Sequence, residues 1–233
     1  MDENILIAVA MGGPGSEREV SLASGRAVVE ALRGEGLRAE AVEVSGTPPE
    51  FPAGTGLVFN VIHGTYGEDG SIQEYLERLG LPYTGAGVAA SRLAFDKAAS
   101  KERFVEAGVP TPASEIAVAP ALPKMVPPLV VKPPREGSSV GVHIVRELSE
   151  VEAAMADASK YGEEILVEQF VEGRELTVGI VGEEVFPVVE IVPPEDGWYD
   201  MSTKYPWLSG QETGSQYLCP APLSPSETAK VQE

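Results

Sequence analysis

The sequence predicts an α/β protein with two parts: a parallel sheet covered by helices, then an α+β region whose strands are largely antiparallel. Two observations support this division. Up to about residue 90, short apolar runs alternate with segments that carry apolar residues at helical spacing, which is typical of strand–helix–strand units. Beyond that point, apolar runs return on themselves through short loops. We therefore predict one domain at residues 1–95 and a second at 96–233.

The first part is predicted to hold three strands and two helices. Ser16, with Glu19 three residues later, has the pattern of a capping box, so a helix is expected to begin at Ser16 and to end at Gly34. A second helix is expected to open at Ser71 and to stop at Gly80. The strands are expected at residues 5–10, 39–44 and 57–62.

The later part is predicted to mix strands, helices and two irregular segments. A proline-rich connector is expected at residues 118–128 and a long irregular loop at 193–216. Helices are expected at residues 100–107 and 149–160 and from about residue 226 onward. Strands are expected at residues 129–132, 140–145, 165–170, 176–181 and 185–192, the last two joined as a hairpin through residues 182–184.

Composition excludes several classes of function. The chain has 36 acidic and 17 basic residues, a net charge of −19, and nucleic acid phosphates would be repelled by it. No apolar run approaches the ~18 residues that a membrane span needs, and the N-terminus lacks the pattern of a secretory signal. The one cysteine, Cys219, can form no internal disulfide, which suits a reducing compartment. We therefore expect a cytoplasmic protein that binds neither nucleic acid nor membranes.

One loop has the chemistry of a phosphate site. Lys132 leaves a predicted strand beside a loop that contains Gly137, Ser138 and Ser139. Such a loop offers backbone N–H groups and hydroxyls, and the lysine adds a point charge. A polar hairpin with an exposed lysine would have the same residues. The residues alone leave the two interpretations open.

Longer stretches resemble one family, the D-alanine–D-alanine ligases of the ATP-grasp superfamily. The resemblance covers residues 5 to about 221 in family order. The matching stretches are Gly12-Gly13-x-x-Ser16-Glu17-Arg18-Glu19-Val20-Ser21-Leu22-x-Ser24-Gly25, His63-Gly64-x-x-Gly67-Glu68-Asp69-Gly70-x-Ile72-Gln73, Tyr83-Thr84-Gly85-x-Gly87, Ser91, Asp96-Lys97, Val131 to Gly141, Glu168 to Val171, Gly173 to Thr177 and Lys204-Tyr205.

The resemblance implies a fold and a set of cofactors. The N-terminal domain would be a Rossmann-like parallel sheet (pre-ATP-grasp), followed by an α+β ATP-grasp domain that is incomplete at its C-terminus. ATP and two Mg²⁺ (or Mn²⁺) ions would serve the complete enzyme. The family's metal ligands, an Asp and a Glu-x-Asn, would lie beyond residue 233, so no metal ligand is expected within this chain.

The resemblance also implies roles for individual residues. Glu17, Ser138 and Tyr205 would be catalytic. The first D-alanine would be bound by Glu17, His63, Ser138, Lys204 and Tyr205. The nucleotide would be bound by Lys97, Lys132, Ser138, Ser139, Glu168, Gln169, Phe170, Val171, Glu175 and Lys204. Without the resemblance, Glu17 would be read as a glutamate matching a helix dipole and Glu175 as a surface glutamate.

The expected function is ATP-dependent joining of two D-alanine molecules through an acyl phosphate, to supply peptidoglycan synthesis. Two alternatives stay open. One is a ligase with D-serine or D-lactate as acceptor, although family members that use D-lactate usually have a histidine where this chain has Tyr205. The other is a non-catalytic fragment that only binds nucleotide or substrate. A homodimer through the N-terminal domain is expected by the same resemblance.

Overall fold

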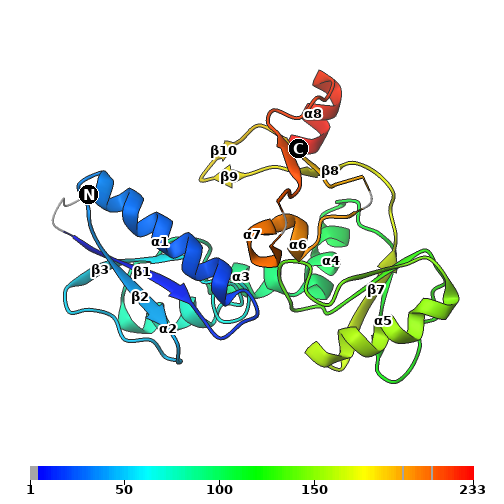
Figure 1. The fold of residues 1–233 in the computed structure, drawn as a ribbon, viewed down its shortest axis with the longest axis horizontal. Coiled ribbons are helices and arrows are strands. Elements are labelled where there is room, and N and C mark those ends of the chain that lie inside the picture. Colours follow the sequence, from blue (N-terminus) through cyan, green and yellow to red (C-terminus); the bar gives the residue numbers. More distant parts are fainter. Residues whose placement is uncertain (1–4, 196, 211) are drawn as a thin grey trace. The chain divides into compact units, whose positions relative to one another are not determined.

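The computed structural model describes residues 5–195, 197–210 and 212–233, and Figure 1 shows their fold. The chain forms two compact units, residues 1–170 and 171–233. The first unit contains two separate sheets, one before and one after residue 95. The domain boundary predicted at residue 95 stays a prediction. No described helix combines the length and apolarity needed to cross a bilayer.

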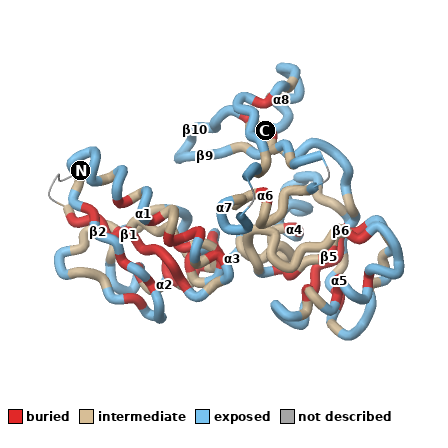
Figure 2. The backbone as a smooth tube through the Cα atoms, in the orientation of Figure 1, coloured by how far each residue is buried: buried red, intermediate tan, exposed pale blue. Residues whose placement is uncertain are grey.

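A three-stranded parallel sheet of order β2-β1-β3 opens the first unit, as predicted. Its central strand β1 is buried along its whole length, which Figure 2 shows as a continuous red segment. The elements of this part are β1 (Leu6–Gly12), α1 (Arg18–Gly34), β2 (Arg38–Val44), β3 (Thr55–Asn60), α2 (Ser71–Leu79) and α3 (Val88–Phe95).

Alternating side chains of β1 serve two cores, one on each face of the sheet. Val9 and its same-face neighbours pack with Leu22 and Val29 of α1. Ala8 and its same-face neighbour pack with Leu76 and other side chains of α2. A strand in a parallel sheet covered on both faces carries apolar residues at every position, which is why the run could be predicted as a buried strand.

The start of α1 corrects one prediction. The helix is capped at Glu17, not Ser16, and Glu17 makes no side-chain capping bond. The Ser16 side chain interacts with Glu136 instead, so no capping box with Glu19 forms. The Glu17 carboxylate is also used elsewhere, because it accepts a hydrogen bond from Ser138.

A four-stranded antiparallel sheet of order β4-β7-β5-β6 forms the rest of the first unit. Leu129, Val131, Ile165 and Val167 face α5 and form the core with it. Their neighbours along β5 and β7 therefore point to the opposite face. The elements are α4 (Lys97–Glu106), β4 (Ser114–Val118), β5 (Leu129–Lys132), β6 (His143–Val145), α5 (Val151–Ala158) and β7 (Glu164–Gln169), with 3₁₀ turns at Leu148–Glu150 and Ser159–Tyr161.

The sequence predictions for this region missed two elements, α3 and β4, and placed the start of α4 too late. The helix begins at Lys97 because the Asp96 carboxylate accepts hydrogen bonds from the backbone N–H groups of Ala98 and Ala99. Asp96 is thus an N-cap that the sequence pattern contained. The predicted strand at residues 140–145 is shorter, because residues 137–142 form turns.

The second unit is built on a small antiparallel sheet of order β12-β11-β8. Its strands are joined by a bidentate pair, in which Arg174 donates to both oxygens of Glu190 at 2.6 Å. The elements are β8 (Glu175–Thr177), β9 (Ile180–Val181), β10 (Glu184–Val185), β11 (Val189–Val192), α6 (Met201–Lys204), α7 (Pro206–Ser209), β12 (Gln216–Leu218) and α8 (Pro225–Gln232).

Three predictions change in this unit. The hairpin around Gly182 is confirmed, but each of its predicted strands is interrupted, at Gly179 and at Pro187, so that four short strands result. The predicted irregular loop contains the single-turn helices α6 and α7, the first capped by Asp200 and the second begun by Pro206. Residues 196 and 211 of that loop lie outside the described residues, and β12 was not predicted.

Leu129→Ala should lower the free energy of unfolding by about 2–5 kcal/mol, because the Leu129 side chain is fully buried between the antiparallel sheet and α5. Leu122, which is 57% exposed, gives a matched control whose substitution by alanine should change that free energy by less than about 0.5 kcal/mol. Urea unfolding followed by circular dichroism measures both. Equal losses for the two variants would contradict this placement of the core.

Candidate active site

Glu17 is a buried carboxylate with one satisfied oxygen. It lies at the N-terminus of α1 and is 3% exposed. Its Oε1 accepts a hydrogen bond from the Ser138 hydroxyl, and its Oε2 is buried with no hydrogen-bond partner within the described part of the chain. A buried carboxylate oxygen without a donor is costly, so this atom indicates a place for a ligand that carries N–H or O–H groups.

Two glycines leave the space that this carboxylate occupies. A Cβ atom at Gly137 would lie 2.2 Å from Glu17 Oε2, and one at Gly64 would lie 2.7 Å from the same oxygen. Gly64 also has a φ of 67°, in the left-handed region. Side chains at either position would displace the carboxylate, so the site requires both glycines, and Gly64 is also favoured by its backbone conformation.

Arg18 and Ser21 hold the loop and helix that carry Glu17. The Arg18 guanidinium donates to the carbonyl oxygens of Gly13 and Val44 at 3.0 and 2.8 Å. The Ser21 hydroxyl, fully buried, accepts from the Gly12 N–H at 2.8 Å and donates to the Val61 carbonyl at 2.6 Å. Ser21 thereby ties the end of β1 and helix α1 to the segment that leads to His63.

His63 follows β3, at the carboxyl end of the parallel sheet where such folds bind ligands. Its Nδ1 lies 3.8 Å from a Glu68 oxygen and its Nε2 lies 3.4 Å from the Ser24 hydroxyl. Interaction with Glu68 raises the pKa of His63 above its ordinary value, although partial burial opposes the shift and the charge of Glu17 adds to it. His63 and Glu68 line a cavity of about 340 Å³ together with Gln73 and Ser91.

Lys97 and Lys132 line a second cavity of the first unit, of about 310 Å³, with Glu168. Lys97 Nζ donates to the Glu136 carbonyl, and Lys132 Nζ contacts a Glu168 oxygen. Burial lowers the pKa of Lys97, and the nearby Lys132 ammonium lowers it further. Two partly buried ammonium groups that repel each other form a site suited to a polyanion.

The loop at residues 133–139 connects these lysines with Glu17. Ser138 and Ser139 have φ angles of 46° and 63°, a left-handed conformation that is uncommon outside glycine. The loop is held against α4, because Pro134 O accepts from the Lys97 N–H at 3.0 Å and Arg135 Nε donates to Asp96 at 2.8 Å. Strain of this kind is found at ligand sites, where it keeps backbone groups oriented.

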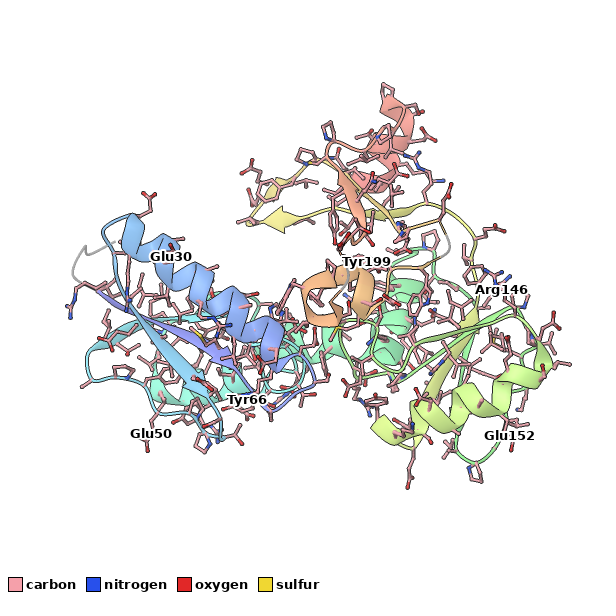
Figure 3. All side chains as sticks on the ribbon, viewed as in Figure 1. Glu30, Glu50, Tyr66, Arg146, Glu152 and Tyr199 are labelled. Carbon is pink, nitrogen blue, oxygen red and sulfur yellow. The ribbon has the colours of Figure 1, made fainter. Side chains whose placement is uncertain are left out.

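Residues 168–171, which are expected to bind the nucleotide, lie at the end of β7 and directly after it. The N–H groups of Gln169 and Phe170 donate to the carbonyls of Ala113 and Pro128. The Phe170 ring lies 5.1 Å from the Arg146 guanidinium, and Arg146 is labelled in Figure 3. Val171 begins the second unit and is 65% exposed. Whether these residues contact a nucleotide stays a prediction.

Three further predicted residues lie in the second unit. Burial raises the pKa of Glu175, and the charge of Lys204 opposes the shift. The Lys204 ammonium lies 4.6 Å from the centre of the Tyr199 ring, which Figure 3 labels. Tyr205 separates α6 from α7. The catalytic role expected for Tyr205 stays a prediction.

Sequence reasoning missed Lys101 and gave no role to Glu68. Glu68 belongs to the motif that begins at His63, and the spacing of the two residues could have suggested an imidazole–carboxylate pair. Lys101 had no local signal, because its partner Glu168 is 67 positions away. Within residues 5–195, 197–210 and 212–233, no group of three or more His, Cys, Asp or Glu side chains could hold a metal ion.

Comparison with known proteins identifies the family of this chain. Family models described as the D-ala D-ala ligase N-terminus and C-terminus match residues 38–86 and 106–233. The D-alanine–D-alanine ligase of Methylacidiphilum infernorum is 41% identical over 227 residues, which are 97% of this chain and 73% of that protein. The chain belongs to the D-alanine–D-alanine ligase family. The ligase of Citrifermentans bemidjiense is 44% identical, with the same shares covered.

Solved structures agree with this family assignment. D-alanyl-alanine synthetase A of Vibrio cholerae superposes with a TM-score of 0.81 at 25% identity, over 100% of this chain and 79% of that one. The VanG D-Ala:D-Ser ligase of Enterococcus faecalis gives 0.77 at 26% identity, over 98% and 80%. Membership makes this chain an ATP-dependent ligase of the ATP-grasp class that forms carbon–nitrogen bonds.

Glu68→Gln should lower the pKa of His63, because it removes the carboxylate whose interaction with the imidazole contributes most to the raised value. A raised pKa stabilises the folded chain below the unfolded value near 6.5, and this stabilisation is lost as the pH rises through the folded value. The variant should therefore lose stability mainly at acid pH. NMR titration of the imidazole C–H signals, assigned with a His143→Gln variant, measures the pKa. An unchanged value would show that Glu68 does not set it.

Proposed function

We propose that this chain joins two D-alanine molecules at the expense of ATP and so supplies the dipeptide for peptidoglycan synthesis. The observation that supports this most is the contact of Glu17 with Ser138, because it links a buried carboxylate with a spare oxygen to the loop that follows Lys132. The ammonium group of an amino acid needs a negative charge, and a polyphosphate needs positive charges. The first unit supplies the carboxylate of Glu17 for the former and the ammonium groups of Lys97 and Lys132 for the latter.

The first D-alanine would bind at Glu17. Its ammonium group would donate to Glu17 Oε2, the buried oxygen that has no hydrogen-bond partner within the described residues. His63, whose pKa is raised by Glu68, would supply a positive charge or an N–H donor beside the substrate carboxylate. These contacts would hold the substrate with its carboxylate directed away from Glu17.

The nucleotide phosphates would bind at Lys97 and Lys132, with the backbone of residues 133–139. In the reaction, the carboxylate of one D-alanine attacks the γ-phosphate of ATP, which releases ADP and forms an acyl phosphate. The amine of a second D-alanine then attacks the carbonyl carbon of the acyl phosphate, which releases inorganic phosphate and a proton. The lysines would neutralise the phosphate charge, and the strained loop would present Ser138 and Ser139 to it. Glu168, Gln169, Phe170 and Val171 would border the adenine.

The proposed roles of the second unit concern the ribose and closure of the site. Glu175 would accept hydrogen bonds from the ribose hydroxyls, because a carboxylate has two acceptor oxygens. Lys204 and Tyr205 would act from a closing segment that excludes water from the reactive phosphate. The described residues offer no carboxylate cluster for Mg²⁺ or Mn²⁺, so no step is assigned to a metal here.

Two acceptors compete for the second site. The similarity to a D-Ala:D-Ser ligase structure keeps D-serine as an alternative to D-alanine. A fragment that binds without catalysis is the other alternative. We also propose homodimerisation through the N-terminal part, which rests on the family resemblance, and a cytoplasmic location, which rests on the composition and the single cysteine.

Release of ADP should depend on D-alanine when the chain is mixed with ATP and Mg²⁺, and D-serine and D-lactate should support slower release. Glu17→Gln should reduce kcat/KM for D-alanine by about 10- to 100-fold, the loss expected when a charge-assisted hydrogen bond becomes neutral. Coupled-enzyme detection of ADP measures both. Faster release with D-serine would assign the chain to the alternative acceptor, and nucleotide binding without any release would leave the binding fragment.

Gly137→Ala should reduce the same kcat/KM by a similar factor, because the new Cβ would overlap Glu17 Oε2 and break the contact with Ser138. Gly46→Ala is the matched control, since a Cβ at Gly46 meets nothing within 4 Å. Thermal unfolding of both variants separates loss of activity from loss of fold. Full activity in a folded Gly137→Ala variant would mean that the carboxylate does not need its present position.

A further inference from the structure

Lys101 belongs to a buried cluster of charges. The proposed reaction gives roles to its other members but none to Lys101. It extends from α4 toward Glu168 of β7, and both residues are only 9% exposed. Glu168 Oε2 accepts a hydrogen bond from Lys101 at 3.0 Å, while Oε1 contacts Lys132 of β5. One carboxylate is therefore shared by two ammonium groups.

The sheet register explains why these three side chains meet. Val130 of β5 lies opposite Glu168 of β7, and Lys132 lies opposite Leu166. Side chains two positions apart share one face of a strand, so Lys132 and Glu168 are diagonal neighbours on the same face. The other face is the apolar core with α5. Lys101 is four residues after Lys97 on α4, so both lysines project from one side of that helix.

The two lysines that contact Glu168 are held differently. Lys101 Nζ also donates to Thr111 Oγ1 at 2.8 Å and to the Pro112 carbonyl at 2.7 Å. An ammonium group has three N–H donors, so all those of Lys101 are engaged with the protein. Lys97, Lys101 and Lys132 all line the cavity of about 310 Å³, but the Lys101 ammonium is already bound by these protein groups. Lys101 is fixed in place, whereas Lys132 is placed to meet a ligand.

A buried carboxylate that loses its only cation is strongly destabilised. If Lys132 were the only cation beside Glu168, any movement of Lys132 toward a phosphate would leave the Glu168 carboxylate buried without a cation. The hydrogen bond from Lys101 avoids this cost, because the Lys101 ammonium remains bound to Glu168 when Lys132 moves. The charged groups that face Glu168 in the first unit are Lys97 and Lys101 from α4 and Lys132 from β5.

We propose that Lys101 is the permanent counter-ion of Glu168, and that this allows the Lys132 ammonium to pass from Glu168 to the phosphates of the bound nucleotide. Lys101 is then a positioning residue, which never touches the nucleotide. The inference rests on the proposed nucleotide role of Lys132 and adds a residue to it.

Lys101→Gln tests the proposal, because glutamine keeps hydrogen-bond donors but carries no charge. In this variant, nucleotide binding would leave Glu168 without a cation unless the carboxylate takes up a proton. Binding of ADP with Mg²⁺, measured by calorimetry at pH 7–8.5 in buffers of different ionisation enthalpy, should show proton uptake that the unsubstituted chain lacks. ADP affinity of the variant relative to the unsubstituted chain should fall by up to roughly tenfold per pH unit.

Three further variants separate charge from structure. Lys101→Arg keeps the charge and should bind ADP without extra proton uptake. Adding Glu168→Gln to Lys101→Gln removes the carboxylate that needs a cation, so the double variant should also bind without extra uptake. Lys160→Met removes an exposed lysine that pairs with Asp157 and should leave ADP binding unchanged. If the role of Lys101 were purely structural, extra proton uptake on ADP binding would not be confined to Lys101→Gln.

A second measurement needs no substitution. When ADP and Mg²⁺ bind to the unsubstituted chain, the NMR chemical shift of the Lys132 Nζ group should change and that of the Lys101 Nζ group should not. Equal proton uptake by the unsubstituted chain and Lys101→Gln, or a Lys101 signal that moves with that of Lys132, would overturn this inference alone. Failure of the unsubstituted chain to bind ADP would overturn the proposed nucleotide site and the inference together.

Discussion

The hydrogen bond from the Ser138 hydroxyl to the Glu17 carboxylate is the contact on which the rest of the site depends. It joins residues 121 positions apart, one at the N-terminus of α1 and one in the loop after β5. Because Glu17 is buried, its charge is tolerated only with donors around it. One donor is supplied by the protein and the place of another is left for a ligand, so the same carboxylate fastens the loop and selects an ammonium group.

The surrounding structure fixes this contact from both ends. On the side of the parallel sheet, Ser21 and Arg18 fasten the start of α1 to the ends of β1 and β2. On the other side, Asp96 caps α4 and also accepts from Arg135, so hydrogen bonds tie the helix that carries Lys97 to the loop that carries Ser138. These hydrogen bonds thereby fix the positions of the candidate substrate site and the candidate phosphate site.

The sequence predicted the elements whose signal is local. The strand β1 and the helix α2 were recognised because burial on both faces and amphipathic spacing leave clear patterns. The cap at Ser16 was wrong because a distant partner, Glu136, engages that side chain. Most candidate site residues, Glu17 and Lys97 among them, were predicted through the family resemblance, whereas Lys132 was first indicated by the chemistry of its loop. Neither local sequence patterns nor the family resemblance indicated Lys101, because only the folded sheet brings Glu168 close to it.

An acidic chain can bind a polyanion only if its few cations converge. Three of its seven lysines, Lys97, Lys101 and Lys132, line one cavity, where burial and the nearby Lys132 ammonium lower the pKa of Lys97. Glu168 opposes that tendency, since its carboxylate stabilises the two ammonium groups it touches. The carboxylate also attracts Lys132 away from a ligand, so a site with Glu168 alone would hold its lysines charged but occupied. Lys101 resolves this conflict, because its ammonium is bound by Glu168, Thr111 and the Pro112 carbonyl, so Glu168 keeps a cation when Lys132 turns to a ligand.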